Sequence, residues 1–302
     1  MDVSQLIFDY LNGKGWVVLE DVEEEVSLLA SGENNTNYLI TASELYGETK
    51  YLFRINHSSR LGLTDQIEYE FAVLQAVRRS GVTPRPFYCD ANPGEGLGNG
   101  VMLMEYLEGR PLNYSVDWAI AAEVLAKIHS VPVDTRLIVQ KNPVWDYARE
   151  CRGLGDHFDT AHGDDIKEKL CDCIDELTAL AGEVERLSEK ESPVIVNGIA
   201  CSSDFLIDDE GENKIGKLVD WESGVIASRY VDIGQFFAQA CLVGEFGYCR
   251  DEEEKSRFAE VYINATGLDI SVQEVVSRAT LFEKSTMLRA KIWNCVALGD
   301  VK

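Results

Sequence analysis

The order of the periodic patterns restricts the fold more than any other feature, because strand-like segments are concentrated near the start of the chain and helical segments dominate the rest. A helical pattern opens the chain and ends at a glycine-containing turn. β-rich runs follow over residues 16–55, then an amphipathic helix over 65–81, and then two more strands, TPRPFYCD and NGVMLMEYL. This order predicts a five-stranded antiparallel sheet within residues 16–107, in a small α+β lobe.

The remainder of the chain is mostly helical, with apolar residues at three- and four-residue steps in segments such as DWAIAAEVLAKIHSV. One strand–turn–strand segment, residues 194–222, interrupts these helices and contains the tight polar turn DDEGEN. Gly109 and Pro111 mark the boundary between the two kinds of segment. We therefore predict an α+β fold with two lobes, a small antiparallel-sheet N-lobe of residues 1–107 and a mainly helical C-lobe of residues 108–302.

Composition and charge limit the classes of partner. The chain has 302 residues, of which 45% are hydrophobic, and this is enough for a sizeable core and argues against disorder. Its 28 basic and 52 acidic side chains give a formal net charge of -24. A field of this sign repels nucleic acids and anionic membranes, so we expect neither as a partner. It also repels nucleoside triphosphates, so a nucleotide site in this chain needs local cations or metal ions.

The cysteines, histidines and N-terminal residues indicate a reducing compartment. The chain has eight cysteines without a CxxC pair and only four histidines, which argues against a structural zinc site. We interpret the cysteines as free thiols. The N-terminal residues lack the pattern of a signal peptide, and the sequence contains no apolar run long enough to span a membrane. These features predict a cytoplasmic protein.

Two pairs of ionisable residues stand out beside the predicted strands. Arg54 ends the strand YLFRIN, and Glu70 lies beside the apolar stripe of the following helix. A charge directed toward a core is costly unless it is paired, so each could compensate the other. Asp204 precedes the strand FLI and Asp220 follows the strand KLV. The tight turn between these strands could bring both carboxylates to one mouth, where Mg²⁺ would relieve their repulsion. Taken alone, these residues also fit surface or turn positions.

Several of these segments together resemble the aminoglycoside phosphotransferase and choline kinase family, whose fold is similar to that of protein kinases. LLASGENNTNYLIT resembles the hairpin that covers the nucleotide phosphates, and YLFRIN resembles the strand with a phosphate-binding cation. EYEFAVLQAV resembles the helix whose glutamate pairs with that cation, and VMLMEYLEG resembles the hinge whose backbone binds adenine. The resemblance implies these nucleotide-binding residues: Gly32, Asn34, Arg54, Glu70, Glu105 and Leu107.

The resemblance extends to the strand–turn–strand segment and to the helices on either side of it. LVDWE resembles the end of the metal-binding strand, with Asp220 as a ligand, and Asp204 stands where the family has an asparagine ligand. LAKIHS resembles a family helix that ends at His129, and RYVDIGQFFAQ resembles a later helix in which Asp232 has a structural role. The implied cofactors are Mg²⁺ and ATP or another nucleoside triphosphate, and the implied fold is two-lobed and protein-kinase-like.

The sequence departs from the family pattern at the catalytic loop. The family usually has H-G-D-x-x-x-x-N there, whereas NGIACSSD occupies the same register before the strand FLI. Asn197 replaces the histidine, and Ile199 replaces the aspartate that orients the acceptor hydroxyl. A literal H-G-D occurs at residues 162–164, but Lys169 stands where the asparagine should follow. We interpret that motif as the N-terminus of a long amphipathic helix.

Three functions stay open on the sequence. We favour a phosphotransferase-like protein that binds Mg-ATP but transfers phosphate weakly or not at all to a small-molecule hydroxyl, because the Ile199 side chain can neither accept a proton nor form a hydrogen bond. An active ATP-dependent small-molecule kinase with an atypical loop is one alternative, in which Asp204 acts as both ligand and base. An interaction scaffold without a nucleotide site is the other. In the favoured interpretation the chain binds its nucleotide and works through a protein partner. The sequence defines neither a catalytic residue nor the acceptor.

Overall fold

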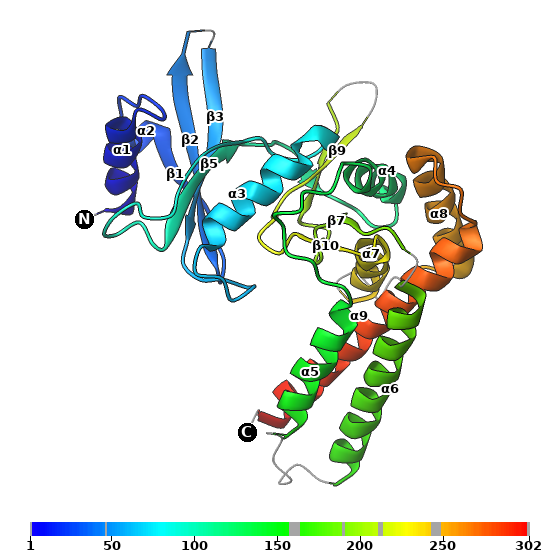
Figure 1. The fold of residues 1–302 in the computed structure, drawn as a ribbon. Helices are drawn as coiled ribbons and strands as arrows, with labels where there is room; N and C mark the ends of the chain where they lie inside the picture. The colour runs from blue at the N-terminus through cyan, green and yellow to red at the C-terminus, as the bar shows by residue number, and fades with distance from the viewer. Residues whose placement is uncertain are drawn as a thin grey trace. The chain divides into compact units, whose positions relative to one another are not determined.

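The computed structural model of the chain describes residues 2–45, 47–156, 164–188, 191–210, 214–242 and 249–300 (Figure 1). The chain divides into two compact units. The first comprises Met1–Arg110 and Leu206–Gly224, and the second comprises Pro111–Phe205 and Val225–Lys302. In this division the segment after Phe205 belongs to the unit that contains the N-terminal residues, whereas the sequence pattern groups it with the helical lobe. The boundaries of the lobes themselves stay a prediction.

The first unit is built on one antiparallel sheet with the strand order β1-β2-β3-β5-β4, which confirms the predicted five-stranded sheet. The strands are β1 (Val26–Ser31), β2 (Asn35–Glu44), β3 (Gly47–Asn56), β4 (Pro86–Asp90) and β5 (Gly100–Glu105). Side chains alternate between the two faces of a strand. Phe53 and Ile55 of β3 therefore enter an apolar core, while Arg54 between them faces the opposite side. Arg54 is in register with Asn37 of β2 and Met102 of β5.

Two helices lie on opposite sides of this sheet (Figure 1). The helical segments of the unit are α1 (Val3–Lys14), α2 (Val22–Glu25), α3 (Gln66–Val77) and the 3-10 turn η1 (Arg78–Ser80). Ile7 and Leu11 of α1 are fully buried in the core that contains Phe53. Gly15 and Gly81 follow α1 and η1 in the left-handed conformation, with φ of 66° and 72°, as predicted for helix ends. The short α2 lies in a segment predicted to be strand-like, because one helical turn has no detectable period.

The strand–turn–strand segment supplies β8 (Phe205–Asp208) and β9 (Ile215–Leu218). Leu218 N–H donates a hydrogen bond to the Val82 carbonyl oxygen at 2.8 Å, which ties β9 to the chain just after α3. β6 (Arg110–Pro111) lies in sequence where the two units meet, and Arg110 Nε forms an ion pair with Asp209 Oδ2 at 2.5 Å. These contacts hold the residues that follow β9, including Asp220, within the first unit.

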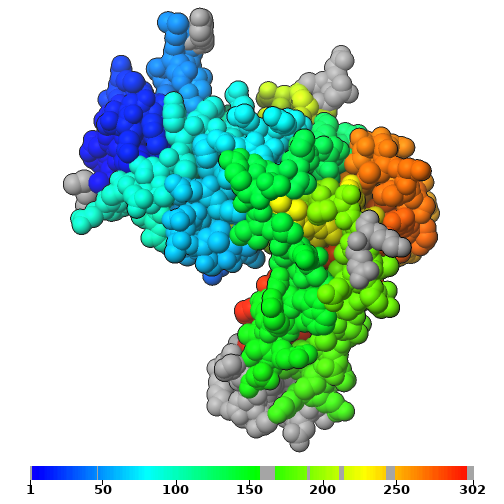
Figure 2. Space-filling model, in the orientation of Figure 1, coloured from blue at the N-terminus to red at the C-terminus, as the bar shows by residue number. Residues whose placement is uncertain are grey.

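The second unit is mainly helical, as the sequence predicts. Its helices are α4 (Trp118–His129), α5 (Pro143–Asp156), α6 (Asp164–Ser188), α7 (Tyr230–Leu242), α8 (Glu252–Thr266) and α9 (Val272–Asp300). Helices α5 and α6 lie side by side, and their side chains form one continuous surface (Figure 2). Residues 162 and 163 of the literal H-G-D motif lie outside the described residues, and α6 begins at the third residue of that motif. No described helix is long and apolar enough to cross a bilayer.

Helix α7 is the buried centre of the second unit. Gly234 allows it to approach α9, since a Cβ atom at this position would lie 2.5 Å from the Ala279 carbonyl oxygen. Phe236 of α7 stacks on Phe258 of α8 with 5.1 Å between ring centroids. In the same unit β7 (Val194–Val196) pairs antiparallel with β10 (Val225–Ala227). The tight packing holds Asp232, in the first turn of α7, at a defined place beneath the residues that follow β7.

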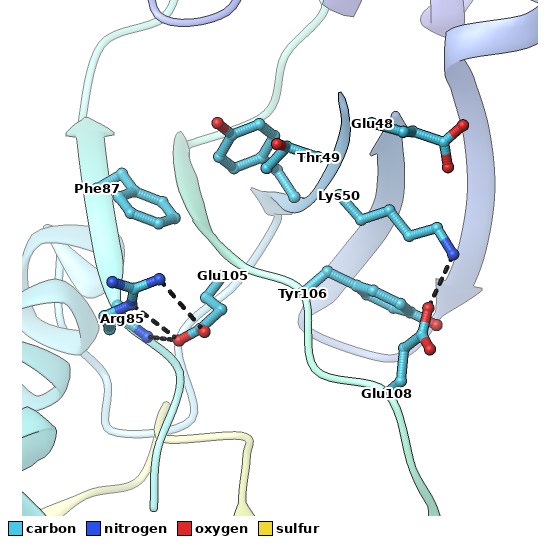
Figure 3. A pocket seen from close by; sticks show the side chains of 9 residues that line it. Glu48, Thr49, Lys50, Arg85, Phe87, Glu105, Tyr106 and Glu108 are labelled. Carbon is cyan, nitrogen blue, oxygen red and sulfur yellow. Dashed lines mark hydrogen bonds and ion pairs between the residues drawn. The ribbon is translucent and has the colours of Figure 1, made fainter. Parts of the chain in front are cut away.

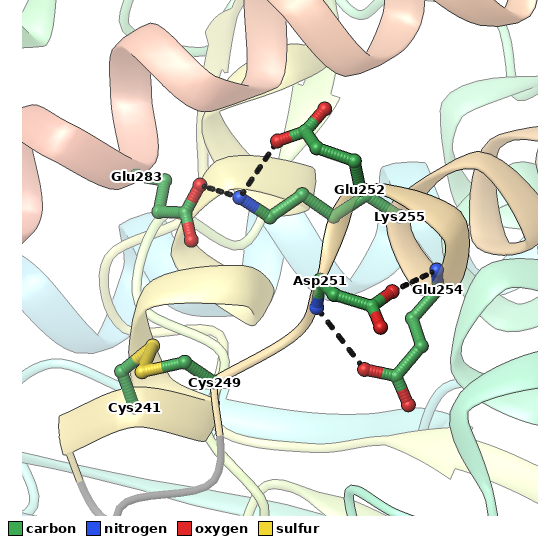
Figure 4. Close-up of a disulfide and its surroundings, with 7 residues drawn as sticks. All are labelled: Cys241, Cys249, Asp251, Glu252, Glu254, Lys255 and Glu283. Atoms are coloured by element: carbon green, nitrogen blue, oxygen red, sulfur yellow. Dashed lines mark hydrogen bonds and ion pairs between the residues drawn. A yellow bond between two sulfur atoms is a disulfide. The ribbon is translucent and has the colours of Figure 1, made fainter.

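The cysteines differ from the prediction in one pair. Cys241, near the end of α7, and Cys249 form a disulfide with 4.6 Å between their Cα atoms (Figure 4). The prediction of free thiols is wrong for these two residues, because two cysteines eight residues apart meet only if the chain folds back after α7, and no pattern in the sequence indicates this. The thiols that remain free are those of Cys89, Cys151, Cys171, Cys173, Cys201 and Cys295.

Candidate functional site

A cluster of three charged residues lies within the first unit. Arg54 Nη1 donates to Glu70 Oε1 at 2.5 Å and to Asp220 Oδ1 at 3.1 Å. The side chains of Arg54 and Glu70 are 7% and 2% exposed, whereas that of Asp220 is 34% exposed. The Arg54–Glu70 ion pair predicted from the sequence is therefore confirmed. Arg54 Nε also donates to Asn37 Oδ1 at 3.0 Å, so the guanidinium is held in one orientation.

The carboxylates of Glu70 and Asp220 keep the buried Arg54 guanidinium charged. Burial by itself lowers the pKa of the Arg54 guanidinium, but Glu70 and Asp220 outweigh the effect of burial and hold that pKa above its ordinary value. The cation therefore stays charged in a position almost without solvent. Glu70 is buried with it on α3, whereas the partly exposed Asp220 can offer oxygen atoms to a ligand. The cluster thus combines a fixed cation with an accessible carboxylate.

Asp220 has an unusual backbone conformation. Its φ is 59°, the left-handed region, and no other described residue except glycine has a positive φ. A side chain other than that of glycine costs about 1 kcal/mol or more in this region. Strained positions of this kind are concentrated at functional sites, where the surrounding structure holds them. The conformation supports a functional role for Asp220, although its role as a metal ligand stays a prediction.

The turn between β1 and β2 carries the two residues predicted to cover the phosphates. Gly32 N–H donates to the Asn35 carbonyl oxygen at 2.9 Å, which closes the turn. Asn34 Nδ2 donates to Glu222 Oε1 at 3.0 Å, and Asn35 Nδ2 donates to Glu222 Oε2 at 2.5 Å. Sequence reasoning missed Glu222. Its only signal was a second acid two residues after Asp220 in LVDWE, and nothing in that spacing points to the asparagines of the turn.

The predicted hinge follows β5. Glu105 N–H donates to the Arg85 carbonyl oxygen at 2.8 Å, and its carboxylate forms an ion pair with Arg85 Nε at 3.2 Å. Leu107 is buried. Glu105 also lines a surface hollow of about 440 Å³, in which Phe87 and Tyr106 are the labelled aromatic side chains (Figure 3). The binding of adenine by the backbone of Glu105 and Leu107 stays a prediction.

The second unit contains the segment that we predict to occupy the register of the catalytic loop. Asp232 Oδ2 accepts from Asn197 N–H at 3.0 Å, and Oδ1 accepts from Gly198 N–H at 2.8 Å. His129 Nε2 lies 3.2 Å from Asp232 Oδ2, and its Nδ1 lies 2.8 Å from the Tyr262 hydroxyl. Burial raises the pKa of the Tyr262 phenol, so it stays protonated and can donate to His129. These contacts confirm a structural role for Asp232 and give His129 two buried partners.

The side chains of the loop itself offer little acid–base chemistry. Ile199 is half-buried, and its N–H donates to Asn197 Oδ1 at 3.4 Å. Asp204 Oδ2 accepts from Cys201 N–H at 2.8 Å, so this carboxylate stabilises the loop that it ends. Asp204 belongs to the second unit and Asp220 to the first, and their sharing of a metal ion stays a prediction. Within the described ranges, no three or more acidic, histidine or cysteine side chains converge to form a metal site.

The sequence and the fold both match known phosphotransferases. Residues 25–273 match the sequence model of the phosphotransferase enzyme family. The chain belongs to this family. No curated protein matches the sequence of this family member significantly. Its family supports a kinase-type function on a small molecule.

Solved structures with low sequence identity share the fold of this family member. Choline kinase from Cryptosporidium parvum has a TM-score of 0.69 and 16% identity, over 97% of this chain and 89% of that chain. Ethanolamine kinase from Plasmodium vivax has a TM-score of 0.66 and 16% identity, over 99% of this chain and 83% of that chain. An aminoglycoside phosphotransferase from Streptomyces rimosus, in complex with ADP and streptomycin, has a TM-score of 0.60 and 13% identity, over 96% of this chain and 99% of that chain. At these identities the similarity establishes a protein-kinase-like α+β fold.

Proposed function

We propose that the chain binds a Mg²⁺–nucleoside triphosphate, with ATP as the first candidate, and that its phosphoryl transfer to a small-molecule hydroxyl is weak or absent. The observation that carries the binding proposal is the cluster of Arg54, Glu70 and Asp220. A protein with a net charge of -24 needs local positive charge to hold a triphosphate, and Arg54 is a buried cation with a fixed orientation. The aminoglycoside phosphotransferase described with ADP has the same fold and supports the choice of nucleotide.

The residues fit a magnesium ion as well as a nucleotide. Mg²⁺ prefers carboxylate and phosphate oxygens and keeps several water molecules, so one or two protein carboxylates suffice. Asp220 is 34% exposed and offers such oxygens, and Asp204 is the second candidate. A bound Mg²⁺ would neutralise charge on the phosphates and orient them. Arg54 would then bind phosphate oxygens, Glu70 would keep Arg54 in place, and the backbone of Glu105 and Leu107 would bind the base.

The proposal of weak transfer rests on the residues of the second unit. General base assistance to the acceptor hydroxyl contributes about 10²–10⁴-fold in enzymes that use it. Ile199 has no group that accepts a proton, and the Asn197 amide does not titrate near neutral pH. Asp204 already accepts from the Cys201 N–H, a bond that holds it in the loop. The alternative is an active kinase in which Asp204 serves as ligand and base, and a measured turnover distinguishes the two.

The decisive experiment is a thermal-shift titration of the full chain with ATP, in the presence and absence of Mg²⁺. A ligand that binds only the folded state raises its stability by RT ln(1 + [L]/Kd), which is about 2.7 kcal/mol at a hundredfold excess over Kd. We expect a concentration-dependent rise in the unfolding midpoint that requires Mg²⁺. No shift with ATP or GTP would contradict the binding proposal and favour an interaction scaffold.

A further inference from the structure

We propose that Glu222 is a positioning residue, which holds the β1–β2 turn (residues 32–35) through Asn34 and Asn35 and thereby couples this turn to Asp220. The consequence for nucleotide binding rests on the proposed function. The contacts that carry the inference do not depend on a ligand, and all of them lie within the first unit.

Each oxygen of the Glu222 carboxylate has its own hydrogen-bond donor in the turn. Its two carboxylate oxygens each accept from a different asparagine amide, at 3.0 Å from Asn34 and 2.5 Å from Asn35. Glu222 is 5% exposed and Asn35 is 8% exposed. Hydrogen bonds to a charged group are stronger than those between neutral groups, and water competes poorly for them in a buried position. The turn is therefore held by two charge-assisted bonds rather than by its own backbone alone.

Both ends of this network are anchored by other elements of the unit. Asn56, the last residue of β3, donates through Nδ2 to Asn35 Oδ1 at 2.9 Å, so both ends of the Asn35 amide are bonded. Gln66, the first residue of α3, donates through Nε2 to the Glu222 carbonyl oxygen at 2.8 Å. The sheet, helix α3 and the segment after β9 thus converge on one turn.

The two acids of LVDWE have separate tasks. Asp220 accepts from Arg54 and is partly exposed, which suits a residue that contacts a ligand. Glu222 is buried, and both of its oxygens are directed at the turn. We therefore assign ligand contact to Asp220 and the positioning of the turn to Glu222. Asp220 and Glu222 lie two residues apart on one backbone segment. The position of a ligand at Asp220 is therefore fixed relative to the turn that contains Gly32.

The expected benefit is preorganisation. A turn that is already ordered in the free protein loses little conformational entropy when it covers the phosphates, so affinity rises without any new contact to the ligand. Loss of the Glu222 contacts should then release the turn in the free protein and weaken nucleotide binding, while Arg54, Glu70 and Asp220 keep their own ion pairs.

The experiment compares Glu222→Gln with Glu24→Gln, which removes the same charge from an exposed position of α2 in the same unit. A glutamine presents one acceptor and one donor, so one asparagine amide faces another donor and loses its bond. We expect amide hydrogen exchange in the turn of the nucleotide-free protein, measured by mass spectrometry, to become about 10- to 100-fold faster. Calorimetry should show affinity for Mg-ATP reduced about tenfold. The Glu24→Gln variant should match the unaltered protein in both measurements.

A double variant provides the rescue. In Glu222→Gln with Asn35→Asp the introduced amide can donate to the introduced carboxylate, Asn34 and Asn56 keep acceptors, and the net charge is that of the unaltered chain. We expect Asn35→Asp alone to release the turn, because two carboxylates then face each other, and the double variant to restore its protection. The double variant also keeps the test decisive if either single variant fails to fold.

Each outcome bears on a different statement. Unchanged exchange in the turn of Glu222→Gln overturns the positioning role, and so does a folded double variant whose turn stays unprotected. Faster exchange with unchanged Mg-ATP affinity overturns the coupling of the turn to the nucleotide. Failure of the unaltered protein to bind Mg-ATP overturns the proposed function instead, and exchange alone then decides the role of Glu222.

Discussion

The charged cluster of the first unit and the loop after β7 in the second unit are stabilised in different ways. In the cluster, the side chains of Arg54, Glu70 and Asp220 stabilise one another, and two of the three are almost fully buried. In the loop, the carboxylate of Asp232 accepts from the backbone N–H groups of Asn197 and Gly198. The first arrangement depends on which side chains are present, whereas the second depends on the path of the backbone.

This difference shows which parts of a site can change without loss of the fold. Replacing one member of the buried cluster leaves a charge without compensation, and that is costly for folding. Replacing a loop side chain that forms no buried ion pair leaves intact the hydrogen bonds that the loop backbone donates to Asp232. An isoleucine at position 199 is therefore compatible with a correctly held loop. The structure of the loop and its chemistry are separable here, whereas in the cluster they are not.

The largest effect is expected from Ile199→Asp, which introduces a proton acceptor into a loop that is already held in place. If the nucleotide proposal is correct, transfer to a suitable acceptor should rise by about 10²–10⁴-fold. ADP release would be followed across aminoglycosides, choline, sugars and amino alcohols, with Ile199→Asn as the polar control that cannot act as a base. Turnover of the unaltered protein at the rate of typical kinases, about 1–100 s⁻¹, would contradict weak transfer.

The next effect is on stability and comes from Arg54→Met, which leaves Glu70 buried without its cation. Breaking a buried ion pair costs about 3–5 kcal/mol, measurable by urea unfolding at neutral pH. Burial raises the pKa of the Glu70 carboxyl above its ordinary value, an effect that Arg54 opposes. A group whose pKa is raised by folding favours the folded state at low pH. The deficit should therefore shrink as the pH falls from neutral and be smallest below about pH 4, where Glu70 is protonated in both states.

The matched control for Arg54→Met is the double variant Arg54→Met with Glu70→Gln, which removes both charges and should recover part of the lost stability. The comparison between the two regions would fail if Arg54→Met and the double variant were equally stable at neutral pH. It would also fail if the deficit of Arg54→Met grew as the pH fell toward 4.

A smaller effect is expected from Asp232→Asn in the second unit. An asparagine keeps one acceptor but turns an NH₂ group toward a backbone N–H, which should cost about 2 kcal/mol. Hydrogen exchange at Asn197 and Gly198 should become faster, while the turn that Glu222 holds keeps its protection. Equal acceleration in both regions would mean that Asp232 supports the whole protein rather than this loop.

The smallest expected effect concerns Asp220→Asn and Asp204→Asn. Partners of metal ligands alone change metal affinity about 10- to 100-fold, so loss of a direct ligand should weaken Mg-ATP binding about tenfold or more. Calorimetry at several Mg²⁺ concentrations measures this loss of affinity. Comparable losses in both variants would support both carboxylates as metal ligands. Loss only in Asp220→Asn would leave Asp204 as a loop residue, and unchanged affinity in both would remove the metal proposal.

Local patterns in the sequence determined much of the first unit and one contact of the candidate site. Alternating apolar residues specify strands because side chains alternate across a sheet, and the five strands formed as predicted. The Arg54–Glu70 pair could be predicted because a buried charged residue needs a partner, and the next helix offered one. That Ile199 lies in the register of the family's catalytic loop stays a prediction, which rests on the strands on either side of the loop.

Tertiary structure alone decided the contacts between residues far apart in sequence. Asn35 and Glu222 are separated by 187 positions, and each is a polar residue beside a turn, so neither has a pattern that selects the other. No pattern in the sequence predicts the disulfide of Cys241 and Cys249 or the left-handed backbone of Asp220 either. Sequence patterns report which faces an element must bury, because burial follows its local period. Which polar side chains meet depends on how the buried faces pack together, and that is settled only in the folded chain.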